Sequence, residues 1–299
     1  MNQANYDQQN QVKASFNSIY SEPTPHHYLR RMLALDYKMA DQMKSYLSAT
    51  VDMVTDFQST AMVLDVGCSY GISAALLKTG CSYRDLTEFY LQEASSEYDG
   101  CVVSTQRWLE THATRQNVKV VGLDSSAPAI KFAVSSHMID EGIARNLEEE
   151  NSKLTDDEAR LIRECNVLMS TGAIGYVTEK TLDVVLDEFD KNSTFKPRGG
   201  GVVLMSVLEL FDLVPIEKVF TNHGYLFRKL PIRIPQRRFV DEEERNGILE
   251  TLKQRNTLTD AQRSEHQMFA NLCIAAKPER LKSFTKCISD ANHAYSLPA

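Results

Sequence analysis

Short apolar runs alternate along this chain with segments of helical character. The runs end at turn-forming residues and cover positions 61–66, 118–123, 142–147, 166–170, 201–208, 225–230 and 268–276. Their length and composition are typical of strands, whereas intervening segments such as 72–78, 128–138 and 181–191 favour helices. Because neighbouring parallel strands are joined by crossover connections, the alternation predicts a doubly wound α/β fold with a mainly parallel sheet.

The residues ahead of the first strand have a different pattern. Positions 1 to about 15 are polar and rich in Gln and Asn, a composition that cannot bury enough apolar surface to become ordered by itself. Positions 14–55 show a helical apolar stripe that Pro23 and Pro25 interrupt. We therefore expect a helical N-terminal extension, or lid, over residues 1–55.

The remainder divides into a domain at 56–280 and a short C-terminal tail at 281–299. Within the domain, the first two strands are separated by a longer stretch than a compact crossover needs. This stretch is helical in composition and contains Trp108 and several other aromatic residues. We interpret about 80–116 as a helical insert and expect it to help roof the binding site.

Composition and charge exclude several classes of protein. With 42% hydrophobic and 24% charged residues, the 299-residue chain can build a large core. Its net charge of -7 argues against a broad surface for nucleic acid. The six cysteines lack the spacing of a structural zinc site, and no apolar stretch reaches the roughly 20 residues of a membrane span. Since its first residues do not form a secretory signal, we expect a cytoplasmic protein with reduced thiols.

A turn with two glycines and a carboxylate follows the first predicted strand. In the segment DVGCSYG at 65–71, Gly67 and Gly71 tolerate positive φ and allow a ligand to approach the backbone closely. The helix that follows begins with backbone N–H groups that have no partner within the helix. Asp124 ends the second predicted strand. Ligands of doubly wound sheets bind in the crevice at the carboxyl ends of the strands, so these residues predict a binding site there.

These segments resemble the class I S-adenosylmethionine-dependent methyltransferases. Positions 65–71 match the family's first motif, D/E-x-G-x-G-x-G, with Ser69 at the middle glycine, and Asp124 stands where the family has an acid that binds the ribose hydroxyls. Asn146 stands where the family often has an Asp that accepts from adenine, and 168–176 matches the loop that faces the methyl donor. The resemblance covers 61–276. It implies S-adenosylmethionine as cofactor and a seven-stranded sheet whose last strand is antiparallel.

The cofactor-binding residues implied by the resemblance lie at the ends of the first four strands. They are Asp65, Gly67, Cys68, Ser69, Gly71, Asp124, Ser125, Asn146, Leu147, Ser170, Thr171 and Gly172. The metal-dependent catechol type of the family has carboxylates after the fourth strand, where this chain has Ser170 and Thr171. We therefore expect no bound metal.

No motif specifies the methyl acceptor. Displacement at an activated sulfonium mainly requires alignment and desolvation, and a base helps only some acceptors. The candidates for catalysis are His26, His27, Tyr28 and His223, while Tyr20, Tyr28 and Tyr176 are expected to line the acceptor pocket or face the sulfonium. The acidic chain and the expected lid favour a small-molecule acceptor. A protein side chain is the alternative.

Two other functions remain open at this point. The segment at 67–71 also fits G-x-S-x-G, the nucleophile elbow of serine hydrolases, with Ser69 as nucleophile. That reading needs a downstream acid and histidine and strands ahead of the elbow, where this chain is helical in pattern. The second alternative is a protein without catalytic activity that binds the cofactor, or only a partner protein. The basic residues between 228 and 238, followed by acids at 241–244, predict a solvated and charge-balanced face.

Overall fold

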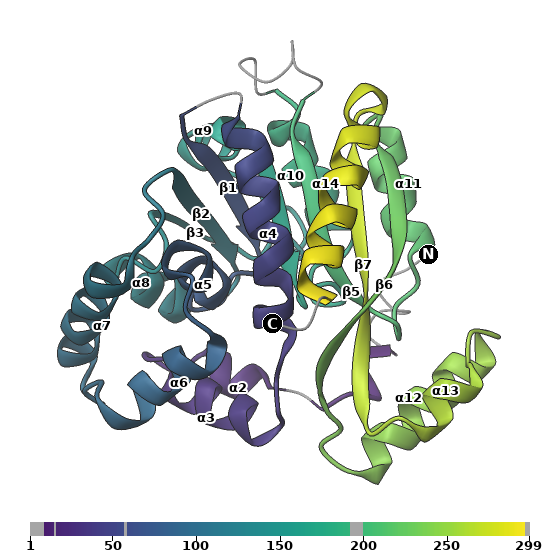
Figure 1. The fold of residues 1–299 in the computed structure, drawn as a ribbon, viewed down its shortest axis with the longest axis horizontal. Helices are drawn as coiled ribbons and strands as arrows, with labels where there is room; N and C mark the ends of the chain where they lie inside the picture. The colour runs from purple at the N-terminus through teal and green to yellow at the C-terminus, as the bar shows by residue number, and fades with distance from the viewer. Residues whose placement is uncertain (1–8, 15, 57–58, 192–199, 297–299) are drawn as a thin grey trace.

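A seven-stranded sheet forms the centre of the protein (Figure 1). The structure is a computed structural model and describes residues 9–14, 16–56, 59–191 and 200–296. The strands occur in the order β3-β2-β1-β4-β5-β7-β6. Their bounds are β1 Ala61–Val66, β2 Val118–Asp124, β3 Glu141–Ala144, β4 Val167–Thr171, β5 Val202–Leu208, β6 Leu226–Arg238 and β7 Gln267–Ala276. Neighbours among β1 to β5 pair in parallel, and β7 runs antiparallel to both β5 and β6. The predicted fold class is confirmed.

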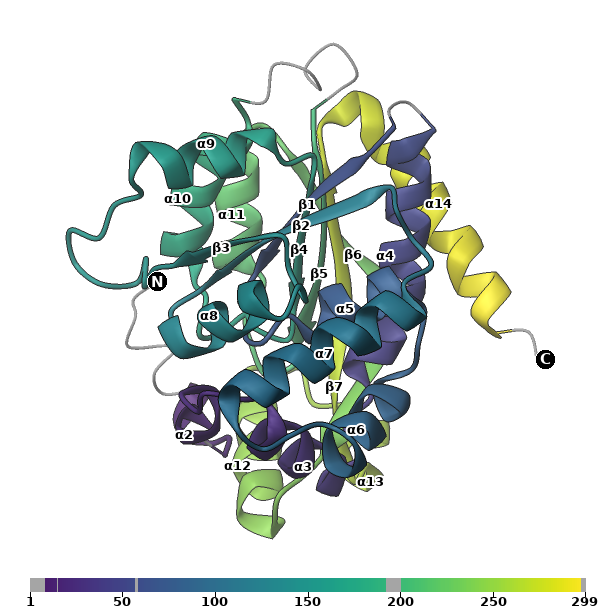
Figure 2. The ribbon, with the colours of Figure 1, turned by 90° about the vertical axis from the view of Figure 1, so that its left-hand side faces the viewer.

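Helices cover both faces of the sheet, as its apolar strands require. Side chains along β5 are buried throughout, which is typical of a strand covered from both sides. Figure 2 shows α9 (Asp156–Glu164), α10 (Glu179–Phe189) and α11 (Val214–Asn222) on one side of the sheet. It shows α4 (Met39–Thr55) and α14 (Pro278–Ser296) on the other. Next to α4 lies α5 (Ile72–Thr79), and α8 (Ala127–Ser135) connects β2 to β3.

Several short helices gather below the edge where the parallel strands end. Figure 1 shows α2 (Asn17–Tyr20) and α3 (His26–Ala34) there, with α12 (Glu242–Gln254) and α13 (Asp260–Ser264) beyond the long ends of β6 and β7. The segment between β1 and β2 adds α6 (Tyr83–Gln92) and α7 (Tyr98–His112), and α6 packs against α3. Within the described part of the chain, no helix combines the length and the apolar character that crossing a membrane demands.

Strand β6 continues well past the predicted 225–230. It is an edge strand, and Pro231 and Pro235 are tolerated in it because an edge strand can leave backbone positions without a ladder donor. Register shifts occur between Lys229 and Arg233 and after Pro235. The extension matters for function because it carries Gln236 and Arg237 to the same edge as the ends of β1 and β2. Strand β3, in contrast, is shorter than the predicted 142–147.

The N-terminal residues divide into two parts with different surroundings. Helix α4 packs on β1, β4, α5 and α14, so it belongs to the helical layer of the sheet rather than to a separate lid. The described residues before it lie over the carboxyl edge. Residues 9–14 are placed there by long-range contacts, since the Ala14 N–H donates to Glu244 Oε1 at 2.8 Å. Residues 9–14 thus become ordered through contacts with distant segments, as expected for a stretch that cannot order by itself. Residues 1–8 and 15 lie outside the described part.

Residues beyond 278 form a long helix where the sequence suggested a tail. Phe284 and Ile288 of α14 are fully buried, and Cys287 Sγ donates to the Ala49 carbonyl of α4. Tyr46 Oη of α4 donates to Asn292 Oδ1 at 2.8 Å. The last helix thus closes the apolar surface that α4 presents away from the sheet.

Truncation of Phe284 to Ala should lower the free energy of unfolding by about 3–5 kcal/mol, because a fully buried ring is lost and a cavity remains. Guanidinium denaturation measures the change. The matched control is Lys282→Ala on the exposed side of the same helix, which should change stability by less than about 0.5 kcal/mol. Equal effects of the two substitutions would show that α14 does not pack as described.

Candidate functional site

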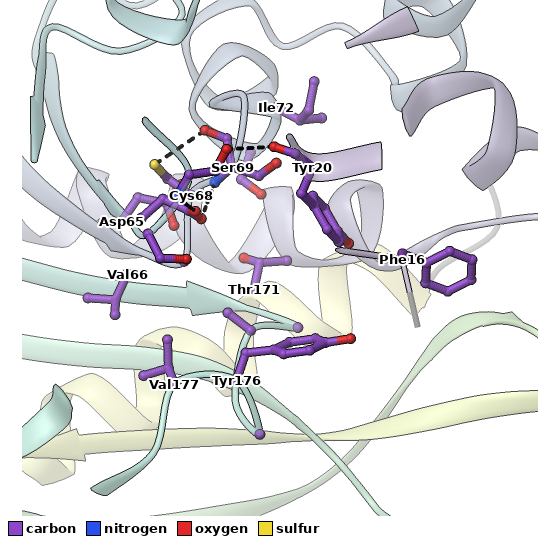
Figure 3. A pocket seen from close by; sticks show the side chains of 18 of the residues that line it. Phe16, Tyr20, Asp65, Val66, Cys68, Ser69, Ile72, Thr171, Tyr176 and Val177 are labelled. Carbon is purple, nitrogen blue, oxygen red and sulfur yellow. Dashed lines mark hydrogen bonds between the residues drawn. The ribbon is translucent and has the colours of Figure 1, made fainter. Parts of the chain in front are cut away.

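A cavity of about 510 Å³ opens at the carboxyl ends of β1, β2 and β4, beneath the N-terminal residues (Figure 3). The strand order reverses between β1 and β4, and such a switch point is where open α/β sheets bind ligands. Its size lies within the range of about 300–1,000 Å³ that is usual for small-molecule sites. Position and size therefore agree with the binding site expected from the sequence.

The turn after β1 is folded so tightly that its two glycine positions have no room for a side chain. Gly67 and Gly71 have φ of +77° and +76°, and a Cβ added to Gly67 would lie 2.2 Å from Ala173 Cβ. Ser69 also adopts a positive φ, +49°, which an ordinary residue takes only when its surroundings impose it. The Gly67 N–H donates to the Leu123 carbonyl at 2.7 Å, which ties the turn to β2.

Asp124 closes β2 and holds the turn in place. Its Oδ2 accepts from the Ser69 N–H and its Oδ1 from the Ser126 N–H, both at 2.8 Å. Burial raises the pKa of Asp124, and the hydrogen bonds from Ser126, Ser69 and Ser125 oppose that rise. The two carboxylate oxygens offer about four acceptor positions and these donors occupy up to three of them, so at least one position remains for a ligand in the cavity.

Asp65 lies one residue before the end of β1 and reaches the same cavity. Figure 3 shows it beside Cys68 and Ser69. Its side chain is almost completely buried, and Oδ2 has no hydrogen-bond partner among the described residues. Burial, together with the nearby Asp124 carboxylate, raises the pKa of Asp65 to about 8. The carboxyl group is therefore mostly protonated at neutral pH unless a cation accompanies it.

Most of the residues expected to bind the cofactor line this cavity. They are Asp65, Gly67, Cys68, Ser69, Asp124, Ser125, Asn146, Leu147, Thr171 and Gly172. Gly71 and Ser170 do not line it. Gly71 begins α5 and packs against Met138 and Ile139, where an added Cβ would approach side chains to about 3 Å, and Ser170 is fully buried inside β4. Both residues therefore belong to the packed layer next to the cavity and not to its lining.

The tyrosines expected on the acceptor side also line the cavity, namely Tyr20, Tyr28 and Tyr176. Figure 3 shows the rings of Tyr20 and Tyr176 on opposite sides of it. Tyr20 and Tyr28 contact each other with ring centroids 5.5 Å apart, and burial raises the pKa of both hydroxyls far above neutral. Tyr28 is thus unsuited to act as a base near neutral pH.

The predicted histidines lie elsewhere. His26 packs edge-on against Tyr90 of α6 at 5.5 Å, and His27 is an exposed surface residue. His223 ends α11 at the opposite edge of the sheet and bonds to Asp183. These positions do not support the catalytic role considered for them. The reason is the direction of the chain, because His223 precedes β6 and the cavity lies where the parallel strands end.

All seven histidines of the chain lie in described stretches, and none of them lines the cavity. A serine nucleophile needs a base within hydrogen-bond reach. Ser69 Oγ is buried and has no hydrogen-bond partner among the described residues. The geometry therefore does not support the serine hydrolase reading. Among the residues that the structure describes, no cluster of His, Cys, Asp and Glu is arranged to hold a metal ion.

Several lining residues were absent from the sequence-based prediction. They are Asn10, Lys13 and Phe16 from the N-terminal segment, and Gln236 and Arg237 from the extended end of β6. The basic run was expected to be solvated, yet Arg237 is buried and forms a two-pronged ion pair with Glu244 at 2.6 and 2.9 Å. The insert, in contrast, contributes no lining residue and supports α3 from outside.

Buried polar atoms without partners concentrate in this cavity. Among the described lining residues they are Asn10 Oδ1, Asp65 Oδ2, Ser69 Oγ, Thr171 Oγ1 and Gln236 Oε1. Folded proteins leave few buried polar groups unsatisfied, so water or a ligand is expected beside these atoms. They occur on both the sheet side and the β6 side, so hydrogen-bonding positions for a ligand are available across the cavity.

Comparisons with known proteins found similarity to solved structures only. No protein-family model matches the chain, and no curated protein matches its sequence. Among solved structures, magnesium protoporphyrin IX methyltransferase from Synechocystis with bound SAM is 10% identical, with a TM-score of 0.39 over 91% of this chain and 90% of that chain. Precorrin-6y C5,15-methyltransferase from Geobacter metallireducens is 11% identical, with a TM-score of 0.38 over 77% and 87%.

An N-methyltransferase from Bradyrhizobium japonicum in complex with S-adenosyl-L-homocysteine is 12% identical, with a TM-score of 0.37 over 85% of this chain and 98% of that chain. TM-scores below 0.5 do not carry a function from one protein to another. The strand order itself makes this chain a Rossmann-like α/β protein. What the cavity binds must be argued from its own residues.

Gly67→Ala should destabilise the protein by about 2–5 kcal/mol, because it adds a backbone strain at positive φ to a collision with Ala173. Thermal and urea unfolding measure the loss. In the double variant Gly67→Ala/Ala173→Gly the collision is removed, so about half of the loss should return. A double variant no more stable than Gly67→Ala would contradict the packing described here.

The ligand-free protein should lose stability as the pH rises from about 4 to 8. The folded state keeps the Asp65 proton up to about pH 8 while the unfolded chain releases it near 3.8, so ionisation favours unfolding in this window. The slope contributed by one such group reaches about 1.4 kcal/mol per pH unit. Urea unfolding at several pH values should show this component in the wild type and not in Asp65→Asn. The exposed Asp157→Asn serves as control and should keep the wild-type slope.

Proposed function

We propose that this protein is an S-adenosylmethionine-dependent methyltransferase that acts on a small-molecule acceptor. The observation that carries the proposal is the pairing of Asp65 and Asp124 beside the glycine turn at the carboxyl edge. S-adenosylmethionine, when bound, supplies a methyl group activated by a positive sulfonium. The chain's own residues have to hold that donor, align the acceptor with it and exclude water.

Asp124 suits a ribose. Its carboxylate sits at the end of β2 with at least one acceptor position free, and its two oxygens match the spacing of vicinal hydroxyls. The Ser69 and Ser126 N–H groups fix the carboxylate so that it does not have to be reoriented when the sugar binds. Asn146 lies next to it after β3, where its amide can contact an adenine edge.

The charge of this half of the cavity suits a cation. Two buried carboxyl groups with raised pKa values lie close together, and a positive ligand relieves the cost of ionising both. The free Oδ2 of Asp65 and the hydroxyl of Thr171 provide acceptors on this side. S-adenosylmethionine carries a sulfonium, an ammonium and a carboxylate group besides its sugar, so its net charge is positive and it complements both features.

The N-terminal segment supports a small acceptor. It covers the cavity through several fixed contacts: Tyr70 Oη donates to the Ile19 and Glu22 carbonyls, and Ser126 Oγ donates to the Tyr20 carbonyl at 2.6 Å. A cover held in this way leaves room for a small molecule more readily than for a folded protein. Location in the cytoplasm belongs to the same proposal and is supported by six free cysteines.

Asp124→Asn should weaken binding of S-adenosylhomocysteine by roughly 100-fold, since a charge-assisted hydrogen bond to the ribose is lost and the turn held by Asp124 is disturbed. Isothermal titration measures it. The exposed Asp157→Asn should bind like the wild type, and a normal thermal unfolding curve should show that the variant is folded. Absence of binding to the well-folded wild type would refute the proposal. Binding of S-adenosylmethionine without formation of S-adenosylhomocysteine in the presence of an acceptor would instead indicate a protein that binds the nucleoside and does not transfer its methyl group.

A further inference from the structure

Lys13 is a buried amine on the side of the cavity that the N-terminal segment and the end of β6 form. It lines the cavity, its side chain is less than a tenth exposed, and its Nζ lies 3.9 Å from the centre of the Tyr176 ring. Phe211 is the second ring near it, at 5.2 Å. An ammonium group held among aromatic faces gains cation–π attraction but still lacks an anion.

Glu244 is the carboxylate near Lys13, and all of its hydrogen-bond acceptor positions are already occupied. Its Oε1 accepts from Arg237 Nη2 and the Ala14 N–H, and its Oε2 accepts from Arg237 Nη1 and the Val240 N–H. Two carboxylate oxygens offer about four acceptor positions, so none remains for Lys13. Among the described residues, no carboxylate pairs with this lysine. Since Arg237 and Glu244 neutralise each other, this end of the cavity has an excess of positive charge.

The same end offers apolar walls and uncharged acceptors. Phe16, Tyr176 and Met268 line it, and the Oδ1 of Asn10 and the Oε1 of Gln236 are buried without partners in the described part of the chain. Resting on the proposed function, we propose that the methyl acceptor is a small carboxylic acid with an aromatic or other apolar body and a hydroxyl or amino group, and that Lys13 binds its carboxylate. The hydroxyl or amino hydrogen then has acceptors in Asn10 and Gln236.

The protonation of Lys13 gives this site a characteristic pH dependence. Burial and the neighbouring Arg237 lower the pKa of Lys13 to about 7, and Glu244 offsets only part of that effect. Tyr176 faces the amine as a neutral phenol, because burial raises its pKa. A carboxylate binds the protonated amine, so its affinity should be about tenfold weaker at pH 8 than at pH 6.

The test uses the full-length protein loaded with S-adenosylhomocysteine. Ligand-observed NMR and titration calorimetry measure binding of 4-hydroxybenzoate, salicylate and anthranilate, each beside its primary amide. In the wild type at pH 6 at least one acid should bind at least tenfold better than its amide. Lys13→Met should lower the affinity of that acid at least tenfold, remove its pH dependence and leave the amide unchanged.

The control variant is Lys119→Met, an exposed lysine on β2 away from the cavity, which should bind the acids like the wild type. Three outcomes overturn the inference: no acid binds the loaded wild type, the acids bind Lys13→Met as well as the wild type, or acid and amide lose affinity equally in that variant. Binding of S-adenosylhomocysteine, titrated separately in both proteins, distinguishes these outcomes from failure of the proposed function.

Discussion

The carboxylate of Asp124 joins the two strands on which the site is built. By accepting from the Ser69 N–H it fixes the turn after β1, and by accepting from the Ser126 N–H it fixes the start of α8 after β2. The strained φ of Ser69 is one that a turn keeps only when the surrounding contacts hold it. A substitution at Asp124 therefore acts on the geometry of the turn as well as on any ligand, and binding measurements need a check of folding beside them.

Local sequence was sufficient to predict the sheet and the half of the cavity next to it. Neighbouring residues determine the apolar strands, the glycine turn and the position of Asp124. Hydrophobic periodicity and a short motif are therefore enough to predict them. The other half depends on contacts between distant segments. Lys13 lies in a polar stretch that orders only because Ala14 and Asn10 meet Glu244 and Gly175, more than 160 residues away.

Arg237 shows most clearly why the second half was missed. In the sequence it belongs to a basic run followed by acids, a pattern typical of a solvated surface. It is buried because β6 extends past two prolines at the sheet edge and brings it under the N-terminal segment. Helix α9 is a different case, since the capping box of Thr155 and Glu158 marks its start in the local sequence. The burial of Arg237, in contrast, results from tertiary packing, which the local sequence pattern does not predict.

The two halves of the cavity differ in charge, and the difference determines which group of a ligand goes where. The sheet side holds Asp65 and Asp124, and the side formed by β6 and the N-terminal segment holds Lys13 beside the neutral Arg237–Glu244 pair. A cationic donor placed on the lysine side, or an anionic acceptor placed between the aspartates, would meet like charge in a poorly solvated space, where such an arrangement costs several kcal/mol. Under the proposed function, the two sides would therefore order donor and acceptor by repulsion as much as by attraction. Asn10, Lys13, Ala14 and Phe16 complete the lysine side. The side that holds Asp65 and Asp124 is therefore built by the sheet itself, whereas the lysine side exists only while the N-terminal segment covers it.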